Sequence, residues 1–195
     1  MILRCATTNP GKLREFRLAA AGAGIEIRPL DGLRDLPEVA EDGDTFEANA
    51  IKKALHYSRY CAGPLFADDS GLEVDALGGA PGVRSARFAG PGATDEANNR
   101  LLLEKLGNAG NRAARFVCVI ALAERGVLTG AFRGVVEGRI VEAPRGAGGF
   151  GYDPLFFYPP FGCTFGEVDS PRKFAVSHRG EALRAMLRRL GGAPV

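Results

Sequence analysis

Apolar residues over the first thirty positions switch between two spacings. Residues 2–6 (ILRCA) and 25–30 (IEIRPL) are short runs rich in aliphatic side chains, which predicts two β-strands. Between them, apolar positions recur at helical spacing over residues 13–20, and Gly22 predicts the end of that helix. A strand, a glycine-containing turn, a helix and a strand in this order are the usual opening of an α/β domain.

Two further helices are indicated by residues that favour helix N-termini. Asp44 is followed three positions later by a glutamate, which is a capping-box pattern and predicts a helix start. Asn49 and Lys53 lie four positions apart on this helix, so we expect them to share a face that borders a cleft. Thr94 predicts the cap of a second helix, which Gly107 ends.

The remaining strands form longer apolar runs. Residues 64–67 predict a buried strand that ends at Asp68-Asp69, and residues 72–77 predict a separate strand. Residues 115–123 and 126–140 predict two long strands joined by a tight turn. Strands joined so closely must be antiparallel, so the predicted sheet is mixed.

The chain is predicted to fold as one unit. A last helix begins near Ser177, and no repeat, low-complexity tract or long linker interrupts the 195 residues. This length suits a single domain over residues 1–195 with a substantial core. The predicted class is α/β, with a mixed central β-sheet flanked by helices.

Composition and charge narrow the classes of function. The net charge of +2 is too small to favour nucleic-acid or membrane-surface binding. No apolar run approaches the roughly 20 residues that span a bilayer, and the N-terminal apolar stretch is too short for a signal peptide. We therefore expect a cytoplasmic protein that binds neither nucleic acid nor membrane.

The four cysteines do not indicate a metal site. They are far apart, form no C-x-x-C pair and have no histidine at metal-ligand spacing. Cys5 and Cys118 lie in apolar strand-like runs, where a thiol usually acts as a small buried hydrophobe. Structural thiols are therefore favoured over zinc ligands or a nucleophile.

The first candidate site is ATTNPGK at residues 6–12, a turn between a predicted strand and a predicted helix. Gly11 permits close backbone approach, the helix N-terminus favours an anion, and Lys12 adds a positive charge. The spacing is not that of the Walker loop. An ordinary capped turn with a surface lysine is the alternative.

The second candidate site is acidic. Glu41 lies just before a predicted helix, and Asp68-Asp69 end a predicted strand. Carboxylates from two segments suit Mg²⁺, which shares its oxygen ligands with substrate phosphates, and one carboxylate can serve as base for an attacking water. The alternative is that Asp68 and Asp69 only begin a turn.

The third candidate site combines GGFGYDP at 148–154 with KFAVSHRG at 173–180. Phe150 or Tyr152 could stack on a purine, and Asp153 could accept a hydrogen bond from a ring N–H. A glycine-rich loop whose aromatic rings cover the core is the alternative. The basic residues of the second segment can hold phosphate or a carbonyl oxygen, whereas His178 is not expected to be the general base.

Together these motifs resemble the inosine-triphosphate pyrophosphatase family, in order and spacing, from Ala6 to Gly180. The resemblance implies a mixed α/β fold with an active-site cleft between two lobes. It also implies a homodimeric hydrolase that uses Mg²⁺ to cleave dITP, ITP and XTP into the monophosphate and pyrophosphate. The residues that it implies for substrate binding are Thr7, Thr8, Asn9, Pro10, Gly11, Lys12, Lys53, Ser70, Phe150, Gly151, Tyr152, Asp153, Lys173, His178 and Arg179.

The resemblance also implies the roles of the acidic residues. Glu41 and Asp69 would be metal-associated, Asp68 would assist them, and Asp69 would be the proton acceptor. Two other functions stay open at this point. A related pyrophosphatase could act on pyrimidine or modified nucleotides, and a regulatory protein could bind nucleotides without catalysis.

Overall fold

The structure is a computed structural model that describes residues 1–21 and 24–191. Within these ranges the chain forms one seven-stranded sheet in the order β2-β1-β3-β4-β5-β6-β7. The strands are β1 (Ile2–Cys5), β2 (Glu26–Pro29), β3 (Leu65–Val74), β4 (Ala113–Glu124), β5 (Val127–Ile140), β6 (Phe156–Tyr158) and β7 (Cys163–Thr164).

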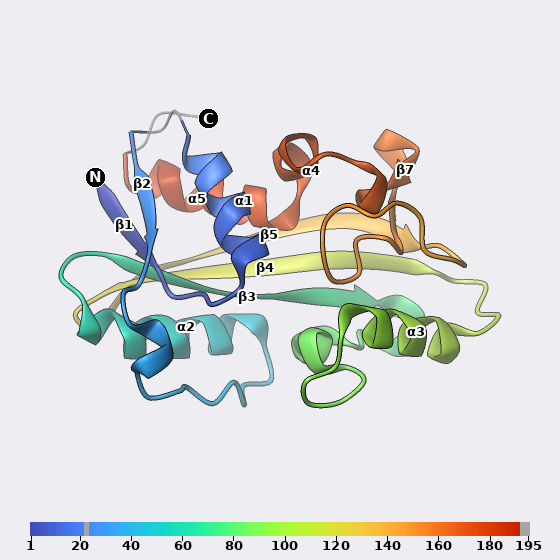
Figure 1. The fold of residues 1–195 in the computed structure, drawn as a ribbon, viewed down its shortest axis with the longest axis horizontal. Helices are drawn as coiled ribbons and strands as arrows, with labels where there is room; N and C mark the ends of the chain where they lie inside the picture. The colour runs from blue at the N-terminus through green and yellow to red at the C-terminus, as the bar shows by residue number, and fades with distance from the viewer. Residues whose placement is uncertain (22–23, 192–195) are drawn as a thin grey trace.

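Helices cover both faces of this sheet (Figure 1). The α-helices are α1 (Pro10–Ala20), α2 (Phe46–Tyr57), α3 (Asp95–Leu106), α4 (Ser170–Val176) and α5 (His178–Arg189). The short 3-10 helices are η1 (Leu33–Asp35), η2 (Ser58–Tyr60), η3 (Asp75–Leu77), η4 (Gly82–Arg87), η5 (Pro159–Phe161) and η6 (Phe165–Glu167). Helices α1, α4 and α5 lie on one face, and α2 and α3 lie on the other.

The alternation of β4 explains this layering. Cys118 and Ile120 pack into the cluster formed with α1 and α5, whereas Val117 and Val119 pack into the cluster formed with α2. Successive side chains of a strand point to opposite faces, so a continuous apolar run is needed when both faces are covered. The run at residues 115–123 meets that need.

The sheet is mixed, as predicted. Strand β1 pairs in parallel with β2 and β3, whereas β3-β4 and β4-β5 are antiparallel. The β4-β5 turn has positive φ at both Arg125 (51°) and Gly126 (80°), as a two-residue type I′ hairpin turn requires.

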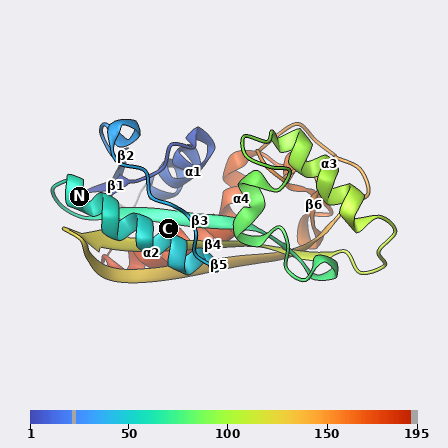
Figure 2. The same cartoon turned by 90° about the horizontal axis from the view of Figure 1, so that it is seen from below.

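The long strands β3, β4 and β5 join two lobes. Figure 2 shows β1, β2, α1 and α2 gathered around one end of these strands and α3 and β6 around the other. The two-lobed α/β fold is therefore confirmed.

Strand β3 is longer than predicted. Strand β3 does not end at Asp68-Asp69 but continues to Val74, because Asp68 and Asp69 keep their pairing with Ile120 and Val119 of β4. Residues 72–77 are thus no separate strand.

The N-cap of α2 is Thr45 rather than Asp44, since the Thr45 side chain accepts a hydrogen bond from the Ala48 N–H. The predicted stop at Gly22 lies outside the described residues.

The predicted starts of the other two helices are confirmed. Thr94 accepts a hydrogen bond from Ala97 N at the start of α3, which Gly107 ends. Ser177 caps α5 by accepting a hydrogen bond from Gly180 N.

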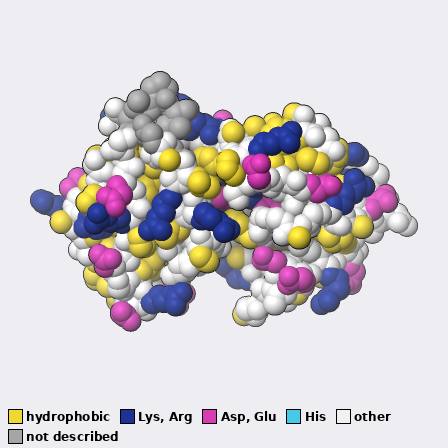
Figure 3. Space-filling model, turned by 45° about the horizontal axis from the view of Figure 1, so that its top comes forward, with side chains coloured by type: hydrophobic (Ala, Val, Ile, Leu, Met, Phe, Trp, Pro, Cys, Tyr) yellow, Lys and Arg dark blue, Asp and Glu magenta, His cyan; other side chains and the backbone are white. Residues whose placement is uncertain are grey.

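Charged side chains of both signs are mixed on the surface (Figure 3), and the cysteines form no disulfide among the described residues. Figure 3 shows basic and acidic side chains interspersed on one face, with hydrophobic ones between them. No helix in residues 1–21 or 24–191 has the length and apolarity needed to cross a membrane. All four cysteines are free thiols, and burial raises the pKa of both Cys5 and Cys118. These two thiols are therefore structural.

Candidate active site

One cavity of about 570 Å³ collects most of the predicted site residues. This volume suits a small-molecule ligand. The predicted residues that line it are Thr7, Thr8, Asn9, Lys12, Glu41, Lys53, Asp68, Asp69, Ser70, Phe150, Gly151, Tyr152, Asp153, Lys173, His178 and Arg179. Pro10 and Gly11 belong to the same predicted set but do not line the cavity.

The turn before α1 is shaped by its own polar side chains. Asn9 Oδ1 accepts a hydrogen bond from Lys12 N at 3.1 Å, and Thr7 Oγ1 accepts one from Asn9 N at 3.2 Å. The turn therefore brings the N-terminus of α1, with its partial positive charge, to the cavity wall.

Packing around the turn requires glycine at position 11. A Cβ built on Gly11 would lie 2.9 Å from Phe150 Cδ1 and 3.1 Å from Asn9 Oδ1. The missing side chain thus makes room for the Phe150 ring and the helix cap.

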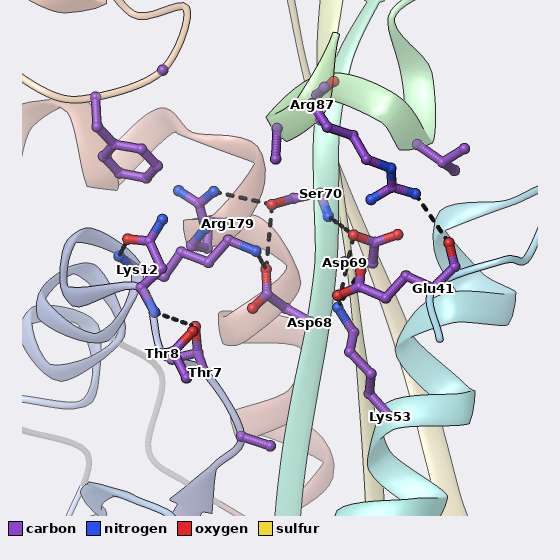
Figure 4. A pocket seen from close by; sticks show the side chains of 18 of the residues that line it. Thr7, Thr8, Lys12, Glu41, Lys53, Asp68, Asp69, Ser70, Arg87 and Arg179 are labelled. Atoms are coloured by element: carbon purple, nitrogen blue, oxygen red, sulfur yellow. Dashed lines mark hydrogen bonds and ion pairs between the residues drawn. The ribbon is translucent and has the colours of Figure 1, made fainter. Parts of the chain in front are cut away.

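Asp68 and Asp69 point to opposite sides of β3 (Figure 4). Asp68 is buried and pairs with Lys12 Nζ at 2.7 Å. Burial alone would raise the pKa of Asp68, but the positive charges of Lys12 and Arg179 outweigh it and lower that pKa. Asp68 is therefore an ionised partner that holds Lys12 in the cavity.

Asp69 belongs to a second group on the other side of the strand. Asn49 Nδ2 donates to Asp69 Oδ2 at 3.0 Å, and Lys53 Nζ lies 3.8 Å from Asp69 Oδ1 and 2.9 Å from Glu41 Oε2. Burial raises the pKa of Asp69, and Lys53 and Asn49 offset this only in part. A carboxylate with a raised pKa beside a cleft is a candidate base. Asn49 and Lys53 thus share one side of α2, as predicted, and both contact Asp69, but only Lys53 lines the cavity.

The acidic groups do not form a complete protein cage for a metal ion. Within residues 1–21 and 24–191, no three His, Cys, Asp or Glu side chains converge at metal-binding spacing. Glu41 and Asp69 do face one shared cation, Lys53 Nζ. Two carboxylate sources plus substrate phosphates are a usual Mg²⁺ donor set, so this pair fits that ion, while Asp68 is occupied by Lys12.

The other end of the cavity is aromatic and basic. The Phe150 ring is partly exposed, with Lys173 Nζ 4.9 Å and the Arg179 guanidinium carbon 5.3 Å from its centroid. Tyr152 is buried instead, and its hydroxyl donates to Ser85 O at 2.8 Å. Of the two predicted aromatics, Phe150 is thus the better placed to stack on a ligand.

Sequence reasoning missed Glu15. This buried carboxylate on α1 accepts a hydrogen bond from Lys173 Nζ at 2.9 Å and pairs with Arg179 Nη1. Burial alone would raise the pKa of Glu15, but Arg179 and Lys173 outweigh it and lower that pKa. Lys173 also pairs with Asp153. Nothing in the LREFR segment distinguishes Glu15 from a surface residue.

Ser70 connects the basic end of the cavity to Asp68 and Lys12. Arg179 Nη2 donates to Ser70 Oγ at 3.1 Å, and Ser70 Oγ donates to Asp68 Oδ2 at 3.3 Å. A chain of hydrogen bonds thus runs from the basic end to Lys12, so a ligand that spans the cavity meets one connected polar surface.

His178 is buried and stacks on Phe116, with ring centroids 4.8 Å apart. Burial, reinforced by the positive charges of Arg179 and Lys173, lowers its pKa well below the ordinary value. The imidazole is therefore neutral at pH 7. His178 Nδ1 and Arg179 Nε have no hydrogen-bond partner among the described residues.

The chain is similar in sequence to proteins that are named dITP/XTP pyrophosphatase. A dITP/XTP pyrophosphatase of Exiguobacterium sp. is 52% identical over 186 residues, which cover 95% of this chain and 95% of the relative. A dITP/XTP pyrophosphatase of Geobacter sulfurreducens is 49% identical over 188 residues, which cover 95% of this chain and 94% of the relative.

Solved structures agree with these relatives. A HAM1 protein from Coxiella burnetii superposes with a TM-score of 0.88 at 40% identity, over 98% of both chains. A nucleoside-triphosphatase / dITP/XTP pyrophosphatase from Mycobacterium abscessus gives a TM-score of 0.75 at 40% identity, over 96% of this chain and 99% of the other. The sequence model of the Ham1 family matches residues 3–189. The chain therefore belongs to the Ham1 family, which bears out the family resemblance of its motifs.

Proposed function

We propose that this protein hydrolyses the non-standard purine nucleotides dITP, ITP and XTP to the nucleoside monophosphate and pyrophosphate. The proposal is carried by one observation: a single cavity joins an aromatic, basic end at Phe150 to an acidic end at Asp69. A nucleoside triphosphate needs both ends. The relatives named dITP/XTP pyrophosphatase support dITP and XTP as substrates.

The triphosphate would lie along the basic groups. The N-terminus of α1 offers its positive end, Lys12 and Lys53 offer ammonium groups, and the Ser70 hydroxyl can exchange its bond to Asp68 for one to phosphate. Mg²⁺, when held by Glu41, Asp69 and the phosphates, would neutralise further negative charge. These positive groups stabilise the negative charge that develops on the leaving pyrophosphate.

Asp69 is proposed as the general base. Its carboxylate accepts a proton from a water molecule whose oxygen attacks the α-phosphorus in line with the leaving group. The bond from that phosphorus to the α,β-bridging oxygen then breaks, and its electron pair leaves with pyrophosphate. Asn49 holds the carboxylate in place during this step.

The purine ring of the substrate would be recognised at the Phe150 end of the cavity. Arg179, or a backbone N–H, can donate to a 6-keto oxygen but is mismatched with the 6-amino group of adenine. His178 Nδ1 and Arg179 Nε are buried and lack partners among the described residues. Unpaired buried polar atoms cost free energy, so a purine that offers complementary groups to this pocket is favoured.

The assembly, location, metal and domain organisation of the protein are also proposals. We propose a homodimeric enzyme, a cytoplasmic location and Mg²⁺ as the metal, on the family resemblance and on the Glu41 and Asp69 donor set. The whole of residues 1–195 is proposed as one domain.

Pyrophosphate release from dITP, dGTP and dTTP in the presence of Mg²⁺ tests the function. We expect the highest kcat/KM with dITP. A preference for dTTP would favour the pyrimidine pyrophosphatase instead. Nucleotide binding without release from any of the three would favour the regulatory protein.

Phe150→Ala is expected to raise KM for dITP while changing kcat little. Stacking of a base on an aromatic ring contributes about 1–3 kcal/mol, so KM should rise roughly 5- to 150-fold, and the loss is common to ground and transition states. Phe161→Ala is the control, because Phe161 packs on Tyr158 outside the cavity. An unchanged KM in Phe150→Ala would mean that another group holds the base.

A further inference from the structure

Arg87 also lines the cavity, although no motif of the sequence indicated it. It is the last residue of η4 and is partly buried. Its Nη2 donates to the backbone carbonyl oxygen of Glu41 at 3.0 Å, so its side chain crosses from the α3 side to the loop before α2 (Figure 4). This contact places the guanidinium at the acidic end of the cavity.

The charge of Arg87 is unmatched, unlike those of the three lysines and of Arg179 described above. Lys12, Lys53, Lys173 and Arg179 each have a carboxylate within ion-pair distance. No described residue provides such a partner for Arg87, and the bond to Glu41 O uses one of its five N–H donors. A partly buried arginine with free donors in a cavity is suited to an anion.

The backbone that carries Arg87 is fixed from two sides. Ser85 Oγ accepts a hydrogen bond from Leu72 N of β3 at 2.9 Å. Asn98 Nδ2 of α3 donates to Ala86 O at 3.3 Å. Arg34 also lines the cavity but is exposed, so the guanidinium of Arg87 is the better positioned of the two. A positioned charge loses less entropy when a ligand binds.

We propose that Arg87 binds the terminal phosphates of the substrate, the part that leaves as pyrophosphate, and so selects triphosphates over monophosphates. The proposal rests on the proposed function and adds a residue to it. A guanidinium matches two phosphate oxygens with its planar fork. The hydrogen bond from Arg87 to Glu41 O lies at the acidic end of the cavity, near Lys53. Phe150 marks the opposite end, where the purine ring would bind.

Affinity for two ligands tests this role. We expect Arg87→Ala to weaken binding of α,β-methylene-dITP, which cannot be cleaved at that bridge, by about 10- to 100-fold, the usual effect of a charge-assisted hydrogen bond. Binding of dIMP should stay within about twofold, since it lacks the terminal phosphates. Arg87→Lys, which keeps the charge without the fork, should lie between Ala and wild type. Calorimetric titration with Mg²⁺ present measures all of these.

Arg84→Ala is the matched control. Arg84 lies on the same 3-10 helix, is exposed and does not line the cavity, so its variant should bind both ligands like the wild type. Equal weakening of dIMP and the triphosphate analogue in Arg87→Ala would assign Arg87 a purely structural role. Unchanged affinity for the analogue would also overturn the proposal, and neither result would affect dITP hydrolysis by the wild type.

Discussion

Asp69→Asn is expected to lower kcat for dITP by about 100- to 10,000-fold, the usual contribution of a general base. The amide has the size of the carboxylate and can still accept the hydrogen bond from Asn49 Nδ2, so the cavity should keep its shape. It cannot take a proton from water, it is a weaker ligand for Mg²⁺ than a carboxylate, and it no longer offers a negative charge opposite Lys53. Steady-state pyrophosphate release at saturating dITP and Mg²⁺ measures the change.

Asp75→Asn is the control for this experiment. Asp75 is exposed and pairs with Arg115 outside the cavity, so its kcat should stay near that of the wild type. Binding of dIMP should persist in Asp69→Asn, because the Phe150 end of the cavity is untouched. A kcat near the wild-type value in Asp69→Asn would remove Asp69 from the proposed mechanism and leave the base to another group.

The helix boundaries indicate how far local sequence determines this fold. The cap at Thr94 was predictable, because one good capping residue precedes an apolar pattern. At α2 two adjacent residues, Asp44 and Thr45, are both good caps. The choice depends on Asn49, whose Oδ1 accepts a hydrogen bond from Gly43 N at 2.8 Å and so fixes the incoming chain. Residue preferences alone do not contain that contact.

Strand β3 marks a second limit. The DDSG sequence favours a turn by composition, yet it continues the strand. Its backbone is satisfied by the β4 ladder, with Ser70 and Gly71 opposite Cys118 and Val117. Its carboxylates are satisfied by Lys12 on one side and by Asn49 on the other. These partners are distant in sequence, so only the folded chain can override the local turn preference.

The cavity residues that lie in sequence motifs could be predicted from the sequence, whereas residues outside the motifs could not. The glycine-rich and charged segments are far apart in the sequence. They come together because the strands and helices next to them meet around β3. Glu15 and Arg87 lie in no such segment. Each looks like a surface charge in the sequence. The role of Glu15 depends on the side of α1 that packs against Lys173 and Arg179, and the role of Arg87 depends on the side of η4 that faces the cavity.

Glu15→Gln is expected to lower the free energy of unfolding at pH 7 by about 3–5 kcal/mol, the usual effect of breaking a buried ion pair from one side. Glu15 is the carboxylate that pairs with Arg179, and it shares Lys173 with Asp153. Glutamine has nearly the same shape but no charge, so it leaves the buried Arg179 guanidinium without an ion-pair partner. For a chain of this length the melting temperature should fall by roughly 6–20 °C.

The pH dependence of this loss separates charge from packing. Since Arg179 and Lys173 lower the pKa of Glu15 below its ordinary value of 4.5, the folded state holds the ionised form more strongly than the unfolded state does. The stability from Glu15 is therefore fully present above pH 4.5 and is lost as the pH falls through its folded-state pKa. Melting curves of wild type and Glu15→Gln should converge in that acidic range.

Glu26→Gln is the matched control for the charge. Glu26 pairs with Arg28 on the surface, where both side chains are more than half exposed, and such pairs contribute little to stability. Its melting temperature should stay near that of the wild type. A Glu15→Gln variant that melts with the wild type at pH 7 would mean that the buried cations are satisfied without Glu15. A gap that persists unchanged into acid would mean that packing, rather than charge, makes Glu15 important.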